Sequence, residues 1–365
     1  MTAPRLVLSA AACALLLAAC SRPAAGPPAP RPAPWIVIGV DGGELSVIET
    51  LWARGELPNL RRLADAGLHT RLATDYGASP VIWTTIATGM PPGRHGITDF
   101  VVPTDAGDVP VSSAARKVPA LWSMLSRAHR RVAVLGWWAS WPAEPVDGLV
   151  LTDRLAQELP QRIYPPERQA ELEAAHAEAR ESGIPFGGND ASQLQDRLVT
   201  RFAVEAVQGD YALVLPYYRS LDLASHQSWR LYEPAAFGDP VPARPGDDPV
   251  SAAYRAVDQA VGEILAAAPP EANVLVISDH GFRATHGEEV QLLLDLDRVL
   301  EAAGLLVRAG EEVDLERSRA FAYRSPDYRA IKFVRFAPEG SDPEPAALER
   351  ARRELGRTLA RATFD

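Results

Sequence analysis

The stretch from Trp35 to Gly43 reads WIVIGVDGG and joins a continuous apolar, β-branched run to an acidic turn. A strand that is apolar on both faces is typical of a parallel sheet covered by helices on both sides. Asp41 stands where this strand is expected to end. Because open α/β sheets bind ligands beyond the carboxyl ends of their strands, the stretch predicts an α/β fold with a carboxylate at its binding edge.

Apolar strands continue to alternate with amphipathic helices along the rest of the chain. Further strands are expected at 68–73, 131–135, 211–216, 273–277, 320–323 and 330–336. Helices are expected at 44–54, 58–66, 80–88, 120–128, 192–207, 250–267, 290–303 and 346–362. This alternation predicts an α/β domain over 35–365, with a central, mostly parallel sheet and helices on both faces. Two polar stretches rich in proline and glycine, near 155–190 and 230–250, are expected to be insertions in that domain.

The first 34 residues are typical of an export signal followed by a tether. An apolar run at 6–19 follows Arg5 and is shorter than the roughly 20 residues of a membrane span, as in a signal peptide. It ends in LAAC, which resembles a bacterial lipobox with Cys20 as the lipidated first mature residue. We therefore expect a lipoprotein signal peptide at 1–19, a lipidated, proline-rich tether at 20–34 and a lipid-anchored protein in the bacterial cell envelope, on its periplasmic side or outer surface. An ordinary signal peptide with an incidental cysteine is the alternative.

The composition is that of a globular protein, with 47% hydrophobic and 23% charged residues among 365. The formal net charge is −10, opposite in sign to that of most nucleic-acid-binding proteins, so no nucleic-acid binding is expected. Both cysteines, Cys13 and Cys20, lie in the first twenty residues. The mature domain is therefore expected to be held together without an internal disulfide, by packing and by any metal that it binds.

Acidic residues and histidines follow three of the expected strands: Asp41 after the first, Asp222 and His226 after 211–216, and Asp279, His280 and His286 after 273–277. Carboxylates and imidazoles are ligands of zinc and similar divalent ions. The spacing of four residues would place Asp222 and His226 on one face of a helical turn. Each residue taken singly could be a cap or a surface group. Together the three strand ends favour a site with ligands enough for two divalent metals, which suits phosphoryl transfer.

Ser79 is the candidate nucleophile. It precedes Pro80 at the expected start of the helix 80–88, in the N-cap position, where backbone N–H groups and the helix dipole favour anions. Metal coordination could deprotonate its hydroxyl. A plain N-cap serine is the alternative interpretation, and Thr84 and Thr85, inside the helix, are alternative hydroxyls.

Four stretches, in this order, resemble motifs of the type I phosphodiesterase/nucleotide pyrophosphatase family of the alkaline phosphatase superfamily. They are IGVDG at 38–42, SPVIWTTIATGMPPGRHGITDF at 79–100, LDLASH at 221–226 and SDHGF at 278–282, and the resemblance covers about 35–336. It implies an alkaline-phosphatase-like fold and two divalent metal ions, expected to be zinc. One ion would be held by Asp41, Ser79, Asp279 and His280, and the other by Asp222, His226 and a third histidine. His286 is chosen as that third ligand because no histidine follows it.

Other residues near these motifs have open roles. Ile82 stands where nucleotide pyrophosphatases carry an asparagine that binds a phosphate oxygen, so metals, backbone N–H groups or another side chain would have to hold the oxyanion. His95 is interpreted as a hydrogen-bonding loop residue. Arg219 would bind a phosphate or lie at the surface. The tryptophans that follow the strand at 131–135 would stack on a substrate or, as we favour, pack under an insertion: Trp137, Trp138 and Trp141.

The resemblance implies a metal-dependent hydrolase of phosphodiester or pyrophosphate bonds in a small phosphorylated substrate, acting through a phospho-Ser79 intermediate. Two alternatives stay open. One is a catalytically inactive envelope lipoprotein that binds a phosphorylated ligand. The other is a phosphomonoesterase or sulfatase-like member of the same superfamily, although the residues that begin with Ser79 do not match the C/S-x-P-x-R pattern of sulfatases.

Overall fold

The structure, a computed structural model, describes residues 32–104, 107–181, 190–240, 246–284, 296–310, 312–314, 316–324, 332–335 and 345–361. The expected signal peptide, Cys20, nearly all of the tether and His286 lie outside the described residues. The chain divides into Met1–Ala33 and Pro34–Asp365, and the fold described below belongs to the second unit.

A six-stranded sheet in the order β6–β5–β4–β7–β1–β8 forms the centre of the fold. All neighbouring strands in it are parallel except the β5–β6 pair. The strands are β1 (Trp35–Val40), β4 (Val132–Leu135), β5 (Gly148–Leu151), β6 (Ile163–Tyr164), β7 (Leu213–Tyr218) and β8 (Asn273–Ser278). The predicted α/β class with a mostly parallel sheet is therefore confirmed.

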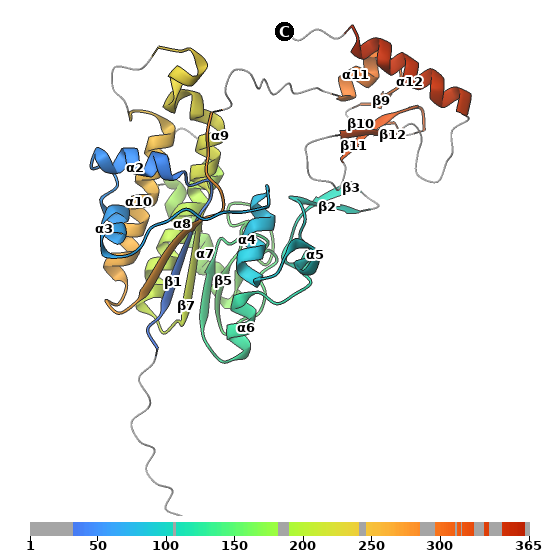
Figure 1. The fold of residues 1–365 in the computed structure, drawn as a ribbon. Coiled ribbons are helices and arrows are strands. Elements are labelled where there is room, and N and C mark those ends of the chain that lie inside the picture. Colours follow the sequence, from blue (N-terminus) through green and yellow to red (C-terminus); the bar gives the residue numbers. More distant parts are fainter. Residues whose placement is uncertain are drawn as a thin grey trace, which may run out of the picture. The chain divides into compact units, whose positions relative to one another are not determined.

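Helices cover both faces of this sheet (Figure 1). Alternate strand residues enter two separate apolar clusters, as the two-residue period of a strand requires. One cluster packs against α2, α7, α8, α9 and α10, and the other against α4 and α6. The helices are α2 (Leu45–Ala53), α3 (Pro58–Ala66), α4 (Ser79–Thr88), α5 (Pro92–His95), α6 (Leu121–Arg127), α7 (Gln169–Glu181), α8 (Asp190–Gln208), α9 (Ser220–Tyr232), α10 (Pro249–Ala267), α11 (Leu296–Ala302) and α12 (Pro345–Leu359).

Short antiparallel pairs stand outside the central sheet. They are β2 (Val101–Thr104) with β3 (Gly107–Pro110), β9 (Arg308–Ala309) with β10 (Glu312–Val313), and β11 (Phe321–Arg324) with β12 (Lys332–Arg335). Near the C-terminus, residues from α11, α12 and the segments between them form a small cluster of their own: Leu300, Leu305, Leu306, Ala320 and Ala351. The strands expected at 320–323 and 330–336 thus pair with each other rather than with the central sheet.

The strand expected at 68–73 is wrong. The segment has no strand conformation and pairs with no strand among the described residues. Leu68 is 92% exposed and Leu72 is 66% exposed, so neither contributes to a core. An extended segment without a partner strand has no ladder hydrogen bonds to stabilise it as a strand. The weak alternation of apolar residues at 68–73 could not distinguish a paired strand from such an unpaired segment.

The stretches expected to be insertions carry regular structure in the parts that are described. The first contains β6 and α7, and α7 buries Leu172 and Ala175 in the main apolar cluster. The second contains the end of α9 and the short 3-10 helix Pro234–Phe237. Other short 3-10 helices lie at Ser113–Ala115 and Pro166–Arg168.

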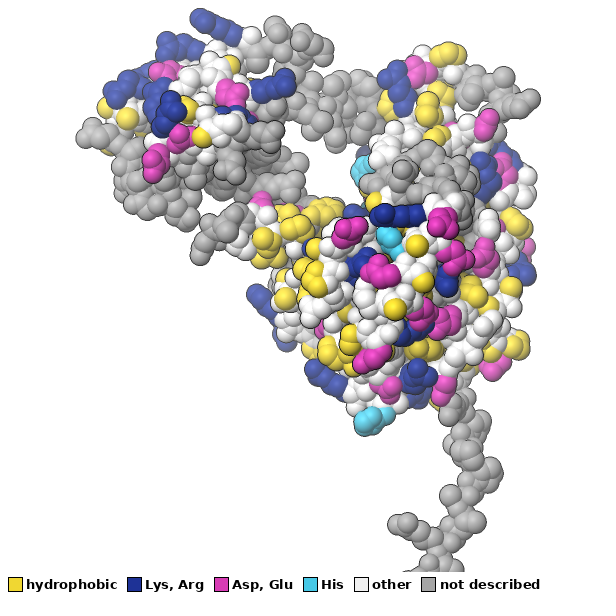
Figure 2. Space-filling view, turned by 180° about the vertical axis from the view of Figure 1, so that it is seen from behind, with side chains coloured by type: hydrophobic (Ala, Val, Ile, Leu, Met, Phe, Trp, Pro, Cys, Tyr) yellow, Lys and Arg dark blue, Asp and Glu magenta, His cyan; other side chains and the backbone are white. Residues whose placement is uncertain are grey.

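No helix within the described residues is both long and apolar enough to cross a membrane. Figure 2 shows one face of the molecule, on which acidic, basic and hydrophobic side chains are interspersed over the described surface.

Candidate active site

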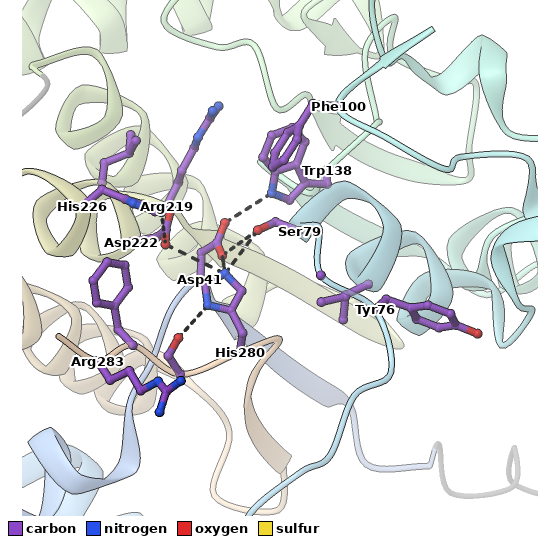
Figure 3. Close-up of a pocket in the computed structure, with 15 residues that line it drawn as sticks. Asp41, Tyr76, Ser79, Phe100, Trp138, Arg219, Asp222, His226, His280 and Arg283 are labelled. Carbon is purple, nitrogen blue, oxygen red and sulfur yellow. Dashed lines mark hydrogen bonds and ion pairs between the residues drawn. The ribbon is translucent and has the colours of Figure 1, made fainter. Parts of the chain in front are cut away.

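Three strands end in register at one edge of the sheet. Val40, the last residue of β1, pairs with Tyr218 at the end of β7 and with Ser278 at the end of β8. The residues that follow these strand ends are therefore neighbours in space. Figure 3 shows Asp41, Ser79, Asp222 and His280 pointing toward one another at this edge.

The carboxylate of Asp41 lies at the centre of the site and is buried. Its Oδ1 accepts a hydrogen bond from Ser79 Oγ at 3.2 Å and lies 3.3 Å from His280 Nε2. Its Oδ2 accepts a short hydrogen bond from the Tyr217 hydroxyl and a longer one, 3.4 Å, from Trp138 Nε1. The two oxygens therefore face different groups, and Oδ1 is the one that meets the candidate nucleophile.

The helix α9 carries Asp222 and His226 on one face, as their spacing predicts. His226 Nε2 lies 3.4 Å from Asp222 Oδ1, and the His226 side chain is largely exposed. Gly42 makes the approach of α9 to β1 possible. It has a φ of +70°, and a Cβ there would lie 2.9 Å from Asp222 Oδ1, so any other residue at this turn would collide with the site.

His280 is oriented by its other ring nitrogen. Nδ1 lies 2.8 Å from the Gly281 carbonyl oxygen. Because a carbonyl oxygen can only accept, Nδ1 carries a proton and donates it there, and the ring is held with Nε2 facing the acids. Nε2 is 3.4 Å from Ser79 Oγ and 3.6 Å from Asp279 Oδ2. Asp279 Oδ1 in turn accepts from the Gly42 backbone N–H at 3.3 Å.

The crowding of these charges shifts their pKa values apart. Burial, and then the charge of Asp41, raises the pKa of Asp222 to about 6 and that of Asp279 to about 8. For Asp41 burial acts in the same direction, but hydrogen bonds from His280 and Tyr217 outweigh it and hold the pKa below its ordinary value. Burial lowers the pKa of His280, but the hydrogen bond with Asp41 and the charge of Asp279 outweigh it and raise the pKa to about 10.

The donor set fits a divalent metal ion. Asp41, Asp222 and His280 each offer a ligand atom, and these atoms lie within 4.8 Å of one another. Asp222 Oδ1 and Asp279 Oδ2 are buried without a hydrogen-bond partner among the described residues. Buried carboxylate oxygens are costly to leave unpartnered, and carboxylate oxygens with imidazole nitrogens are the ligands that zinc and similar ions take.

Ser79 is the first residue of α4 and not its N-cap. Ala78 occupies the cap position, and no side chain caps the helix. The expected N-cap role is therefore wrong, because the Ser79 hydroxyl donates to Asp41 instead of to the helix it begins. The first turn offers few N–H groups to a ligand: Pro80 has none, and those of Val81 and Ile82 both donate to the Ala78 carbonyl at 3.0 Å.

The alternative hydroxyls of α4 are engaged or turned away from the site. Thr85 Oγ1 donates to the Val81 carbonyl at 2.9 Å and lies 3.0 Å from His95 Nε2. His95 is fully buried, and its Nδ1 accepts from the Ile97 N–H, so Nε2 carries the proton given to Thr85. Burial, together with the charge of Arg116, lowers the pKa of His95, as befits a neutral ring. His95 is thus a structural hydrogen-bonding residue, as expected, and Thr84 is buried outside the pocket lining.

A pocket of about 550 Å³ opens over the carboxylate cluster. Beyond the clustered residues it is lined by Tyr76, Gly77, Ile82, Phe100, Trp138, Arg219, Leu223, His226, Gly281, Phe282 and Arg283. Of the three tryptophans noted in the sequence, only Trp138 lines it. Trp137 is buried against Trp83 and Tyr217, and the Trp141 ring lies under Arg154.

Several of these residues were not expected from the sequence. Tyr217, which donates to Asp41, is the last residue but one of β7 and lies one residue beyond the expected end of that strand. A pair of tyrosines that closes a buried apolar run at the binding edge is the signal that could have identified it. Phe100, Tyr76 and Arg283 come from loops, where no periodicity marks them.

Solved structures share this fold. The phosphonoacetate hydrolase of Sinorhizobium meliloti 1021 in complex with phosphonoformate is 15% identical to this chain, with a TM-score of 0.52, covering 85% of this chain and 70% of that one. The complex of the same enzyme with phosphonoacetate has 15% identity, a TM-score of 0.50 and the same coverage of 85% and 70%. At this identity the likeness shows the fold alone. No curated protein sequence matches the chain significantly.

The family model for type I phosphodiesterase / nucleotide pyrophosphatase matches residues 35–357, which include all of the candidate site. The four motifs with which the sequence resembled that family lie inside the match, and the clustering of Asp41, Ser79, Asp222 and His280 brings their polar residues together. The chain therefore belongs to the type I phosphodiesterase/nucleotide pyrophosphatase family, and it is a hydrolase of phosphate esters.

Proposed function

We propose that this hydrolase cleaves phosphodiester or pyrophosphate bonds of small substrates, with Ser79 as the nucleophile and two divalent metal ions, zinc in the first instance, as cofactors. The observation that carries the proposal is the position of the Ser79 hydroxyl. It lies at the start of α4 and donates to Asp41, within 3.4 Å of His280 Nε2, in a cluster that contains unpartnered buried carboxylate oxygens.

The two sets of metal ligands follow the motifs. Asp41, Asp279, His280 and Ser79 would hold one ion, and the second would lie against Asp222 and His226, with His286 as the proposed third ligand. When bound, such ions lower the pKa of a coordinated hydroxyl or water and neutralise developing charge on phosphoryl oxygens.

The reaction of the chain's own residues has two displacements. Ser79 Oγ gives up its proton and forms a bond to phosphorus while the bond from phosphorus to the leaving oxygen breaks, which gives phospho-Ser79; the proton passes to the leaving oxygen or to solvent. Water then attacks phosphorus and gives up a proton, the bond to Ser79 Oγ breaks, and the serine oxygen takes up a proton. The position of Asp41 Oδ1 serves this sequence, because its hydrogen bond aims Ser79 Oγ at the pocket and holds the hydroxyl proton until attack.

A panel of chromogenic substrates tests the proposal. Zinc-loaded protein is assayed with a 4-nitrophenyl phosphodiester, a 4-nitrophenyl pyrophosphate diester, 4-nitrophenyl phosphate and 4-nitrophenyl sulfate. We expect the first two to be turned over fastest. Dominant hydrolysis of the monoester or the sulfate would favour the alternative hydrolases, and binding of a diester without any turnover would favour a non-catalytic protein.

We also propose that the protein is exported and held in the bacterial cell envelope by a lipid on Cys20. The support is the lipobox-like LAAC at 17–20 and the proline-rich segment after it.

A further inference from the structure

Arg219 lines the pocket with its charge unpaired. Its guanidinium stacks over the Trp138 ring, 4.7 Å from the ring centroid. The side chain is half-buried, and no hydrogen bond or ion pair of the guanidinium is found within the described residues. The hydrogen bonds found for Arg219 are made by its backbone: its N–H donates to the carboxylate of Asp196, and its carbonyl accepts from the Leu223 N–H.

This separates Arg219 from the other stacked arginines in the part of the chain that the structure describes. Each of the others also pairs its guanidinium with an oxygen: a carboxylate for Arg61, Arg116, Arg131, Arg168 and Arg230, and backbone carbonyls for Arg154. In those cases the ring supports a guanidinium whose acceptor oxygen also comes from the protein. At Arg219 the Trp138 ring holds the planar guanidinium and its N–H donors in place, and a bound ligand would have to supply the acceptor.

The Arg219 guanidinium does not face the centre of the site. Figure 3 shows its side chain extending past Asp222 and away from Asp41 and His280. A phosphoryl group attacked by Ser79 would lie over Asp41, so the Arg219 donors are turned toward another part of the substrate. The lining beside the guanidinium includes Phe100, which packs edge-on against Trp138. The positive charge of Arg219 acts to lower the pKa values of Asp153, Asp196 and Asp222, but among the described residues no hydrogen bond or ion pair joins its guanidinium to any of these carboxylates.

We propose that Arg219 recognises a second anionic group of the substrate, one that the scissile phosphoryl group does not supply. This rests on the proposed function of the site. It narrows the substrates to phosphodiesters or pyrophosphates in which one of the linked groups carries a further phosphate or carboxylate. Arginine binds both oxyanions through two parallel N–H donors, and a half-buried position strengthens the interaction.

The experiment uses three matched 4-nitrophenyl phosphodiesters whose second arm ends in a phosphate, a carboxylate or a hydroxyl. For wild-type protein we expect kcat/KM to be about ten- to a hundredfold higher with a charged arm, the range for a hydrogen bond to a charged group. Arg219→Gln should abolish that preference, mainly by raising the KM of the two charged diesters. It should leave kcat/KM for the hydroxyl-ended diester unchanged. Arg219→Lys should keep part of it. The ratio between phosphate and carboxylate arms tells which oxyanion is preferred.

Two further arginines serve as controls. Arg131 also stacks on a ring, that of Tyr211, but does not line the pocket, so Arg131→Gln should keep the preference. Arg283 is an exposed cation that lines the same pocket. Loss of the preference in Arg283→Gln with retention in Arg219→Gln would overturn the proposal, and so would equal losses for all three diesters in Arg219→Gln, which would place Arg219 on the scissile phosphoryl group.

The outcomes also separate this proposal from the proposed function. If zinc-loaded wild type hydrolyses none of the diesters, the proposed function fails, and calorimetric binding of the charged and hydroxyl-ended diesters to wild type and Arg219→Gln still decides the role of Arg219. If wild type hydrolyses all three equally, the function stands and the Arg219 proposal fails. Melting temperatures of the variants show that each is folded.

Discussion

The carboxylate of Asp41 is held by two aromatic residues, Tyr217, which lies outside the pocket lining, and Trp138, which also lines the pocket. Tyr217 and Trp138 both donate to Oδ2, and Trp138 also donates to the Tyr217 hydroxyl. Both rings belong to the apolar cluster between the sheet and α4 and α6. They therefore fix the rotation of the carboxylate and leave Oδ1 to face Ser79. If Asp41 holds the proposed metal ion, Tyr217 and Trp138 would orient this ligand from behind.

Removal of one hydroxyl tests this arrangement. Tyr217→Phe deletes a donor to the buried Asp41 oxygen while the ring stays in place. We expect zinc affinity to fall by about ten- to a hundredfold, the usual effect of losing a group behind a metal ligand, and kcat to recover at saturating zinc. Competition with a chromogenic chelator measures the affinity.

The neighbouring tyrosine provides the matched control. The Tyr218 hydroxyl is also buried, but its partner is Thr200, 3.0 Å away on α8. Tyr218→Phe should cost about 1 kcal/mol of stability and leave zinc affinity unchanged. Equal zinc affinities in the two variants would contradict the role assigned to Tyr217.

At the scale of one element, α9 carries Asp222 and His226, and a carboxylate from α8 holds its start. Asp196 accepts from the backbone N–H groups of Arg219 and Ser220, each at 3.0 Å. These N–H groups have no intrahelical partner, because no carbonyl of the helix lies one turn before them. Asp196 therefore sets the position of the helix that brings both residues to the site.

Truncation of this cap should affect the site as well as stability. Asp196→Ala is expected to weaken zinc binding, since α9 can then shift relative to β1. Asp248 caps α10 in the same way, through the Ser251 N–H at 2.8 Å, but carries no site residue. Asp248→Ala should cost about 1 kcal/mol of stability and leave zinc binding intact. If both variants bound zinc like wild type, the positioning role of Asp196 would be refuted.

The pH dependence of stability offers a second test of Asp196. Burial raises its pKa from 3.8 to about 6, against the opposing hydrogen bonds from Ser220 and Arg219. A raised acid pKa means that the folded state holds the proton more tightly than the unfolded state. The protonated Asp196 carboxyl therefore contributes to the free energy of unfolding below pH 4, and this contribution is lost as the pH rises through 6. Relative to wild type, Asp196→Asn should therefore gain up to about 3 kcal/mol of stability between pH 4 and 7. Denaturant unfolding at several pH values measures this, and parallel curves would contradict it.

The elements that the sequence predicted well are those with one dominant signal. The apolar runs of β1, β4 and β8 and the long amphipathic α8 and α10 lie within two residues of their expected bounds. By contrast α7 was hidden in a polar stretch, because only Leu172, Ala175 and His176 are buried along its length. The segment at 68–73 shows the opposite error: a weak strand pattern led to an expected strand, but the segment pairs with no strand among the described residues.

The candidate site shows the same division. Asp41, Ser79, Asp222 and His280 could be found because each belongs to a short contiguous motif at a strand or helix end. The sequence left the roles of Trp138 and Arg219 open and did not mark Tyr217. Their roles depend on contacts between segments 79 or more residues apart, as with Trp138 and Tyr217. Such contacts depend on strand register and helix docking, which local pattern does not determine.

At the scale of the whole molecule, the metal site is expected to stabilise the fold. Three buried or half-buried acids, Asp41, Asp222 and Asp279, meet at one edge of the sheet, and a cation removes their repulsion. Zinc at about a hundred times its dissociation constant would add about 2.7 kcal/mol. Chelation should therefore lower the melting temperature and abolish turnover, and zinc should restore both. Full activity in a sample shown to be metal-free would rule out the metal-dependent mechanism.

The proposed lipid anchor also concerns the whole molecule. Cys20→Ser removes the only thiol that a lipobox at 17–20 can lipidate. We expect wild type to partition into detergent after expression in a bacterium, and the variant to remain uncleaved or to fractionate differently. An intact mass and a fractionation unchanged by the substitution would contradict the anchor.

The most direct test of the account is the effect of Ser79→Ala on kcat and zinc content, measured on one preparation. If Ser79 is the nucleophile, the variant should bind nearly as much zinc as wild type, because Asp41, Asp279 and His280 remain. Its kcat for a phosphodiester should fall by several orders of magnitude, and Ser79→Thr should keep partial activity. A kcat close to wild type in Ser79→Ala, with zinc content unchanged, would contradict the central claim that this hydroxyl attacks phosphorus.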